Sequence, residues 1–393
     1  MMMSSLWRGK WMYFVLGLGI LGGLTGCASD ESSPVGAQLL EGRGFGKVTV
    51  LDSIEAVRES SYHVPMALGK GKNLVGRAGG LTANMLLLFS TFPETLREVK
   101  LEEAELRLIS DRVYADKDRS GAETGVFYAD VYEVRSEWSE DEVRSDALPD
   151  YDPQALLSIS IGASAPDTAT YALPVPLVEG WMDTTAIVAN RGILIVPPED
   201  APFLKRFGSS EHGESPLLWI RYRTAEGESD STTVRPTGDA TWVYRKPSLE
   251  TDGNLILADG DVYRSLLRFD LPEGLDTLTT VNSAVLSLKM DRDRSFVEQM
   301  TVEVWPATQA SWEVEASRTE FSGEPPKVVL SEPTFAVSIE IRSIVQDWIR
   351  DPSVHYGIML RSAGEQEDVF TVFLSDPRLR IIYSEPPGTG TSP

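Results

Sequence analysis

Short apolar runs in which apolar and polar residues alternate recur along most of the chain after residue 46. Between Glu103 and Ser110, for example, Ala104, Leu106 and Leu108 alternate with polar residues. A period of two is typical of half-buried β-strands, whose side chains point to opposite faces in turn. Gly, Pro, Asn and Asp interrupt the runs at short intervals, which indicates turns. The pattern therefore predicts an all-β fold built from antiparallel strands.

The order of these runs repeats once. Both halves contain an apolar strand ending in Phe, an alternating strand, a Trp in a polar loop, a Val-x-x-Trp segment ahead of a Gly, and a last strand ending in Tyr. Phe269 lies 180 positions after Phe89, whereas Tyr383 lies 161 positions after Tyr222, so the first copy carries longer loops. We predict two tandem antiparallel β-sandwiches of jelly-roll type, each with one short helix.

Composition sets the predicted boundaries. The tether, the linker and the tail are rich in Gly, Ser, Pro or acidic residues, which disfavours a packed core. The first strands of the two copies are predicted at Val48–Leu51 and Asp239–Tyr244. The predicted parts are a signal peptide (1–26), a flexible tether (27–46), a divergent first sandwich (47–224), a linker (225–232), a second sandwich (233–385) and a disordered tail (386–393).

The N-terminus has the features of an export signal. Arg8 and Lys10 precede an apolar run from Trp11 to Thr25, which is too short for a stable membrane span. Cys27 follows directly after small residues, and this arrangement resembles the lipobox of bacterial lipoproteins, which implies that Cys27 is diacylated. Because Cys27 is the single cysteine, it serves anchoring and not a disulfide. A cysteine that falls by chance at an ordinary cleavage site is the alternative.

The lipobox resemblance also implies a location. Two or three acyl chains, each contributing about 0.8 kcal/mol per buried CH₂, hold a protein on a membrane almost permanently. In Gram-negative lipoproteins an Asp directly after the cysteine favours the inner membrane, but here Ala28 follows and Asp30 comes later. The resemblance therefore implies the cell envelope, and the outer membrane in a Gram-negative host.

The acidic balance of the chain restricts its partners. The formal net charge of −23 repels phosphate backbones, which excludes nucleic acid as a partner, and gives no attraction to anionic lipid headgroups. Membrane contact is thus expected through the lipid anchor only. Asp116, Asp118 and Ser120 are similar to the opening of a calcium loop, but Phe127 stands where a bidentate Glu is required. We predict no cofactor, with a structural calcium ion as the alternative.

Six segments of the second copy carry a family resemblance. They are Leu266–Pro272, Ala284–Leu288, Val302–Trp312, Val345–Trp348, His355–Gly357 and Leu379–Tyr383. Together they resemble the DNRLRE domain. Such domains are β-sandwich modules of bacterial and archaeal cell-surface proteins and are similar to a family of carbohydrate-binding modules. The resemblance covers nearly all of the second copy and, with more divergence, the first.

Motifs for catalysis are absent from the sequence. There is no Gly-x-Ser-x-Gly elbow and no His-Glu-x-x-His helix, and His63, His212 and His355 fall in three separate loop contexts. We therefore predict no catalytic residues, no metal site and no enzymatic activity, with a polysaccharide lyase or hydrolase as a remaining hypothesis.

Aromatic residues supply the candidate binding sites, because sugar rings stack on flat aromatic side chains. Strand alternation points Trp219 outward, places Trp242 and Tyr244 on one face opposite Val243, and puts Trp305 beside an inward residue. The alternative for each is an aromatic ring buried under a neighbouring loop. We expect Trp138, Trp181, Trp312 and Trp348, which recur in both copies, to be core residues. Two hypotheses follow: a module that binds polysaccharide, or a structural and adhesive scaffold that docks a surface protein.

Overall fold

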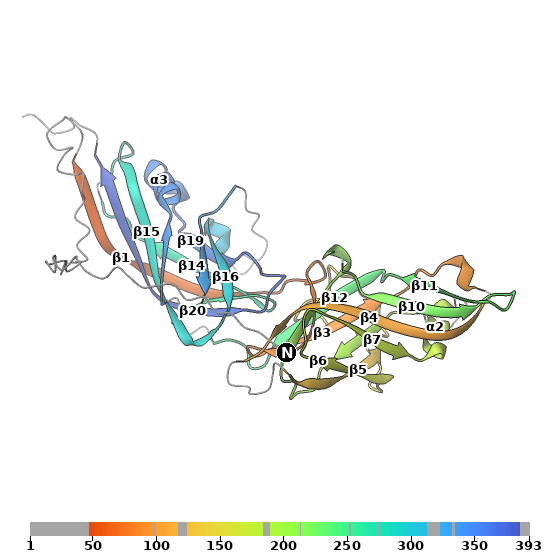
Figure 1. Ribbon diagram of the computed structural model, residues 1–393. Helices are drawn as coiled ribbons and strands as arrows, with labels where there is room; N and C mark the ends of the chain where they lie inside the picture. Colours follow the sequence, from red (N-terminus) through yellow and green to blue (C-terminus); the bar gives the residue numbers. More distant parts are fainter. Residues whose placement is uncertain are drawn as a thin grey trace, which may run out of the picture. The chain divides into compact units, whose positions relative to one another are not determined.

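The computed structural model describes residues 47–97, 99–116, 124–183, 189–212, 214–250, 253–273, 275–312, 323–331 and 335–385. The predicted signal peptide, Cys27, the tether, the tail, and Asp118 and Ser120 lie outside these residues. The described chain is built from two antiparallel sheets and two α-helices, α2 (Val175–Met182) and α3 (Arg342–Arg350) (Figure 1). This confirms the predicted all-β fold with one short helix in each half. None of the helices in the described ranges is long and apolar enough to cross a membrane.

One sheet, which we call the N-terminal lobe, has 11 strands in the order β11-β10-β4-β9-β2-β3-β8-β5-β6, with β12 paired to β3 and β7 paired to β4. Its two layers enclose one apolar core, to which Leu106 and Ile220 contribute from one side and Met85 and Ile195 from the other. The strands are β2 (Asn73–Ala78), β3 (Leu81–Leu88), β4 (Lys100–Tyr114), β5 (Val126–Glu133), β6 (Leu157–Gly162), β7 (Asp167–Leu173), β8 (Ile193–Val196), β9 (Leu204–Phe207), β10 (Leu217–Arg223), β11 (Ser229–Val234) and β12 (Gly238–Arg245).

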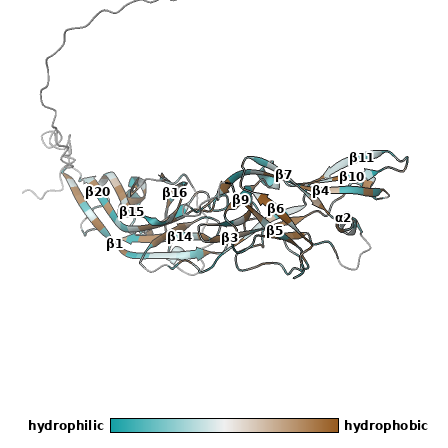
Figure 2. Ribbon diagram, turned by 60° about the horizontal axis from the view of Figure 1, so that its bottom comes forward, coloured by the Kyte–Doolittle hydropathy of each residue, from teal (hydrophilic) through white to brown (hydrophobic). Residues whose placement is uncertain are grey.

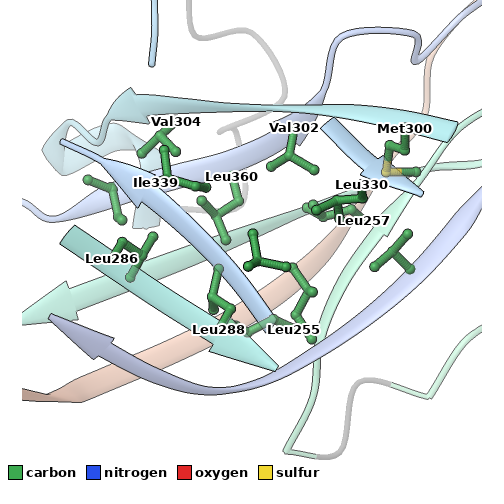
Figure 3. Close-up of a cluster of buried hydrophobic side chains, with 14 of the residues drawn as sticks. Leu255, Leu257, Leu286, Leu288, Met300, Val302, Val304, Leu330, Ile339 and Leu360 are labelled. Atoms are coloured by element: carbon green, nitrogen blue, oxygen red, sulfur yellow. The ribbon is translucent and has the colours of Figure 1, made fainter. Parts of the chain in front are cut away.

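The other sheet, the C-terminal lobe, has nine strands in the order β17-β16-β19-β14-β1-β20-β15-β18, with β13 paired to β14 and β20. Leu286 and Leu288 face Val302, Val304 and Leu360 across its core (Figure 3). Alternating polar and apolar bands along its long strands mark the buried and exposed sides (Figure 2). The strands are β1 (Val48–Val64), β13 (Leu255–Ala258), β14 (Val262–Phe269), β15 (Thr280–Phe296), β16 (Gln299–Pro306), β17 (Lys327–Ser331), β18 (Ala336–Glu340), β19 (Ile358–Ser362) and β20 (Thr371–Ser384).

The first strand of each copy lies in the sheet of the other copy. β1 pairs with β14 and β20 of the C-terminal lobe, whereas β12 pairs with β3 and β11 with β10 of the N-terminal lobe. In Figure 1 the orange β1 accordingly lies beside the blue β20, and the green β12 beside the orange β3. The registers are equivalent, because Ser61 opposes Ser265 and Met85 opposes Thr241. Thr241 lies 180 positions after Ser61, and Ser265 lies 180 positions after Met85. The two copies have exchanged strands reciprocally.

Equivalent hydroxyl groups fix both exchanged strands. Ser61 Oγ accepts a hydrogen bond from the Ile256 amide at 2.9 Å, and it also donates to the Asn254 carbonyl. Thr241 Oγ1 accepts from the Leu74 amide at 3.0 Å and donates to the Lys72 carbonyl in the same way. The first strand of each copy is therefore bonded to the other copy and not to its own.

The pairing corrects the predicted boundaries. Predicted segments 47–224 and 233–385 are not separate sandwiches, because each one supplies a strand to the other sheet. The predicted linker 225–232 is a hairpin, in which Gly227 makes the turn at a φ of 86° and residues 229–232 pair with β10. Its polar composition fits an exposed edge strand as well as a linker, since an edge strand gains nothing from apolar side chains that face water.

Residues of the two lobes also share one core and one ion network. Leu81 and Leu204 of the N-terminal lobe lie in the same buried cluster as Leu257 and Phe370 of the C-terminal lobe. The Asp368 carboxylate accepts hydrogen bonds from the Tyr114 hydroxyl at 2.7 Å and from the Arg206 guanidinium at 3.2 Å. Residues 46–393 accordingly form one compact unit.

Candidate functional site

Trp219 lies on the outer face of the β4–β10 layer. Its neighbours Leu218 and Ile220 are fully buried, so the predicted alternation is correct and the half-buried indole points away from the core. The guanidinium carbon of Arg107, on β4, lies 4.7 Å from the centre of the indole ring. Arg107 also pairs with Glu105 at 2.8 Å. One face of Trp219 is thus occupied by a cation that its own ion pair holds in place.

Trp242 and Tyr244 share the outer face of β12, as predicted. Their ring centres are 4.6 Å apart at an angle of 39°, and both side chains are half-buried. Trp242 packs on a small apolar cluster that includes Leu86 and Leu194, on the side of the sheet away from the main core. The ammonium group of Lys246 lies 5.1 Å from the Tyr244 ring centre. Strand pairing with β3 holds both aromatic side chains on a rigid support.

Two further tyrosines extend this surface. Tyr132, on β5, opposes Leu194 and packs on the same small cluster as Trp242. The Tyr151 ring lies 5.3 Å from the Tyr132 ring, and Tyr151 is 38% exposed. Burial and the neighbouring Asp130 raise the pKa of Tyr132, which keeps its phenol neutral at pH 7. We call these four residues, Tyr132, Tyr151, Trp242 and Tyr244, the aromatic face.

Of the two added residues, Tyr132 and Tyr151, only Tyr132 could be predicted from the sequence. Tyr132 alternates with the buried Val131 along β5, so its outward direction follows from the same rule that identified Trp242. Tyr151 comes from the segment between β5 and β6, outside the strands, where alternation does not indicate the direction of a side chain.

The structure does not bring Trp219 and the aromatic face together. Leu218 and Ile220, the neighbours of Trp219, face the main core of the N-terminal lobe from one layer. Ile193 and Ile195, which flank Leu194 in the sequence, face the same core from the other layer. Trp219 and Trp242 therefore lie on opposite outer surfaces of the sandwich and cannot contact one small ligand together.

Trp305 is not an exposed platform, and the prediction for this residue is wrong. It points away from the core, as expected, but is only 7% exposed. Its indole N–H donates to the Glu303 carboxylate at 3.0 Å, and the Arg361 guanidinium lies 5.3 Å from the ring centre. Glu303 and Arg361 pair at 2.8 Å, and these contacts leave no ring face for a ligand.

The histidines form no catalytic triad among the described residues. His63 lies close to Asp261 and to Ser145, but the Asp261 carboxylate at 2.7 Å and the Ser145 hydroxyl at 3.5 Å both approach the same ring nitrogen, Nε2. A triad requires the carboxylate and the nucleophile on different nitrogens. His212 contacts Ser209, and His355 stacks near Trp348 with a ring separation of 4.4 Å. Burial lowers the pKa of His355.

One acidic cluster joins Glu140, Glu211 and Asp239, whose carboxylate oxygens lie within 4.8 Å of one another. Burial raises the pKa of Asp239 to about 6. Its oxygens accept hydrogen bonds from the Asn73 amide at 2.5 Å and from Ser210. These contacts account for the buried carboxyl group, and we assign no ion to the cluster.

Comparisons with known proteins leave the chain without a family. No family model matches it, and no curated protein is similar to it. A search of solved structures finds the T=3 nodavirus of Penaeus vannamei, determined by cryo-electron microscopy, at 12% identity over 96% of this chain and 97% of that one. The TM-score is 0.11, and a value this low carries no argument about fold or function.

Proposed function

We propose that this chain is a lipid-anchored protein of the cell envelope whose N-terminal lobe binds a polysaccharide at the aromatic face. The observation that carries the proposal is the gathering of four aromatic side chains on one outer face of paired strands. Sugar rings have apolar faces that stack on such rings, and a sheet holds the rings at fixed positions, which lowers the entropy lost on binding.

The proposed site binds sugar and does not cleave it. The aromatic face contains phenol and indole groups but neither a paired set of carboxylates nor an activated nucleophile, which glycoside cleavage requires. We propose that the anchor is Cys27, which keeps the binding lobe at the envelope surface. Trp219 is a weaker candidate for sugar stacking, because Arg107 covers one face of its indole.

Retention of polysaccharides by the protein tests this proposal. A protein that begins at Ala28 keeps the whole compact unit and would be applied to a glycan array and to affinity gels. We expect at least one polysaccharide to be retained. Trp242→Ala and Tyr151→Ala should each weaken that binding about tenfold, or about 1.4 kcal/mol, because each removes one stacking surface.

Trp219→Ala is the matched control, since it also removes an outward aromatic side chain but from the opposite surface. It should leave binding within about twofold. Thermal unfolding of each variant would verify that the sheet is intact. Binding that depends on Trp219 and not on Trp242 would move the site to the other layer, and retention of no polysaccharide would end the proposal.

A second candidate function is docking of a surface protein. Val126 and Tyr128, on the outer side of β5, are 57% and 67% exposed, and β5 lies next to the edge strand β6. Exposed apolar side chains beside a free strand edge favour contact with another protein. Cross-linking in envelope fractions should then recover one stoichiometric partner, and Tyr128→Ser should abolish its recovery while polysaccharide retention is absent.

A further inference from the structure

A cleft lies where the chain leaves β12, next to the turn that joins β2 and β3. Two adjoining hollows of about 740 and 310 Å³ share the Gly79–Gly80 turn, Leu249, Arg294 and Phe373. The end of β15, at residues 292–296, forms the opposite wall. Gly79 and Gly80 have φ values of 57° and 76°, and the Phe296 ring packs directly against Gly79, so the turn needs glycine at this position.

Three cations line this cleft, and each one lies over an aromatic ring. The Lys246 ammonium is 5.1 Å from the Tyr244 ring centre, and the Arg294 guanidinium carbon is 4.2 Å from that of Phe373. Arg292 lies in the same way over an exposed ring, that of Phe335, at 4.4 Å. Contact with a ring restricts the position of each cation but does not neutralise its charge.

None of these three cations forms an ion pair with any residue in the described ranges, although the chain has 59 acidic and 36 basic residues. The Nε atom of Arg292 is buried and has no hydrogen-bond partner there. A fourth cation, Arg245, lies buried in the wall of the cleft, where it donates to the Gly79 carbonyl and to Thr371 Oγ1. Three cations without ion pairs to described residues, in one cleft of so acidic a chain, favour an anionic partner.

The described acidic groups that line this cleft form no ion pairs with Lys246, Arg292 or Arg294. Asp116 accepts a hydrogen bond from the Gly79 amide at 2.6 Å and so supports the turn. Asp293 and Glu250 also line the two hollows. Arg245 forms an ion pair with Asp261, at 3.8 Å, so its charge is already balanced. Apart from Arg245 and its partner, three cations face three carboxylates in the lining, whereas acids exceed bases in the chain as a whole.

We infer that this cleft binds an oxyanion: the carboxylate, sulfate or phosphate group of a ligand. Guanidinium groups form paired, charge-assisted hydrogen bonds to such groups, and ammonium groups add a point charge. Cations already held over rings lose little further freedom on binding. Lys246 continues the row of Trp242 and Tyr244, so the cleft adjoins the aromatic face but is a separate surface, and the inference does not depend on the proposed function.

Calorimetric titration of the full-length protein in detergent tests this inference. Inorganic phosphate, sulfate and trigalacturonate would be titrated separately, since they carry the three anionic groups. We expect at least one to bind, and binding should weaken when salt is raised to about 0.5 M, because exposed charges are screened. A preference for trigalacturonate would identify the source as an acidic sugar, and a preference for phosphate would identify a phosphorylated ligand.

Paired variants locate the site. Lys246→Ala with Arg294→Ala should weaken anion binding at least about tenfold, whereas Arg294→Lys, which keeps the charge, should retain most of it. Arg235→Ala is the matched control, because Arg235 is exposed and lies outside the cleft. Absence of binding for all three anions, or equal binding by the double variant, would overturn the inference. Polysaccharide retention by the Trp242→Ala variant, measured in parallel, would separate failure of the aromatic face from failure of the anion site.

Discussion

One position on the outer face holds an aromatic residue in both lobes, but the burial of that residue differs between them. Tyr132 opposes Leu194 in the N-terminal lobe, and Trp305 opposes Met359 in the C-terminal lobe, so the two aromatic residues occupy equivalent sites. Tyr132 is half-buried and lies beside the exposed Tyr151. Trp305, in contrast, is buried and bonded to the Glu303 carboxylate.

The two lobes share their internal tryptophan contacts but differ in the exposure of their outer aromatic residues. Both lobes hold a landmark indole in the same way: Trp138 donates to the Arg191 carbonyl at 2.8 Å, and Trp312 donates to the Tyr356 carbonyl at 2.7 Å. An outer aromatic ring that is already paired with its own ion network has no free face for a sugar. We therefore assign the proposed polysaccharide binding to the N-terminal lobe.

Removal of β1 should produce the largest difference between the lobes. A chain that begins at Pro65 lacks the strand that pairs with β14 and β20, so the C-terminal lobe should lose its cooperative structure. Hydrogen exchange should show that amides of β14 and β20 lose protection, whereas those of β3 and β10 keep most of it. A chain that begins at Lys47 is the control and should match the intact protein. Loss of protection first in β3 and β10 would contradict the exchange.

Two equivalent glycines should be equally intolerant of alanine. Gly192 and Gly357 have φ values of 88° and 96°, and an added Cβ would lie 2.2 Å from the carbonyl oxygen of Leu87 or of Leu267. Each Gly→Ala change should cost about 3 kcal/mol or more in the free energy of unfolding, measured by urea denaturation, because strain and steric overlap add. Gly180→Ala, where no atom lies within 4 Å of the added Cβ, should cost nothing or stabilise α2. Unequal costs at the two sites would weaken the equivalence of the lobes.

The pH dependence of stability should also differ between the lobes. Burial raises the pKa of Asp239 to about 6 in the N-terminal lobe and that of Asp259 to about 8 in the C-terminal lobe. The folded state binds a proton more tightly than the unfolded state at both sites, so stability falls as pH rises towards each folded-state pKa. Between pH 6 and 8 the decline should come from Asp259 and reach at most about 3 kcal/mol.

Asp259→Asn isolates this contribution. The substitution removes the titrating group and should flatten the decline in unfolding free energy between pH 6 and 8, while Asp239→Asn should leave that interval unchanged. A variant with the same slope as the intact protein would show that Asp259 is not the group responsible.

Local patterns predicted the elements and the direction of their side chains. Alternation alone gave the outward position of Trp219 and the shared face of Trp242 and Tyr244, because side chains on a strand alternate whatever its partners are. The two helices followed from their spaced apolar residues. Burial of Trp305 did not follow, since it depends on Arg361, which β19 brings in from far along the chain.

Local sequence patterns do not identify which strands pair with each other. β1 and β12 have equivalent registers, and either strand could present a similar alternating face to β3 or to β14. The choice is made by long-range contacts such as those of Ser61 and Thr241. The cleft is likewise assembled from segments that lie far apart in the sequence, none of which carries a recognisable anion-binding motif.

An engineered disulfide tests the reciprocal exchange most directly. A protein that begins at Ala28 contains no cysteine, so introduced pairs report without interference. The Ser61 and Ser265 hydroxyl oxygens lie 2.9 Å apart, so Ser61→Cys with Ser265→Cys should form an intrachain disulfide in dilute oxidised protein. Ser61→Cys with Met85→Cys, the pair expected if β1 stayed in its own copy, should remain reduced. Oxidation of the second pair and not of the first would contradict the exchange.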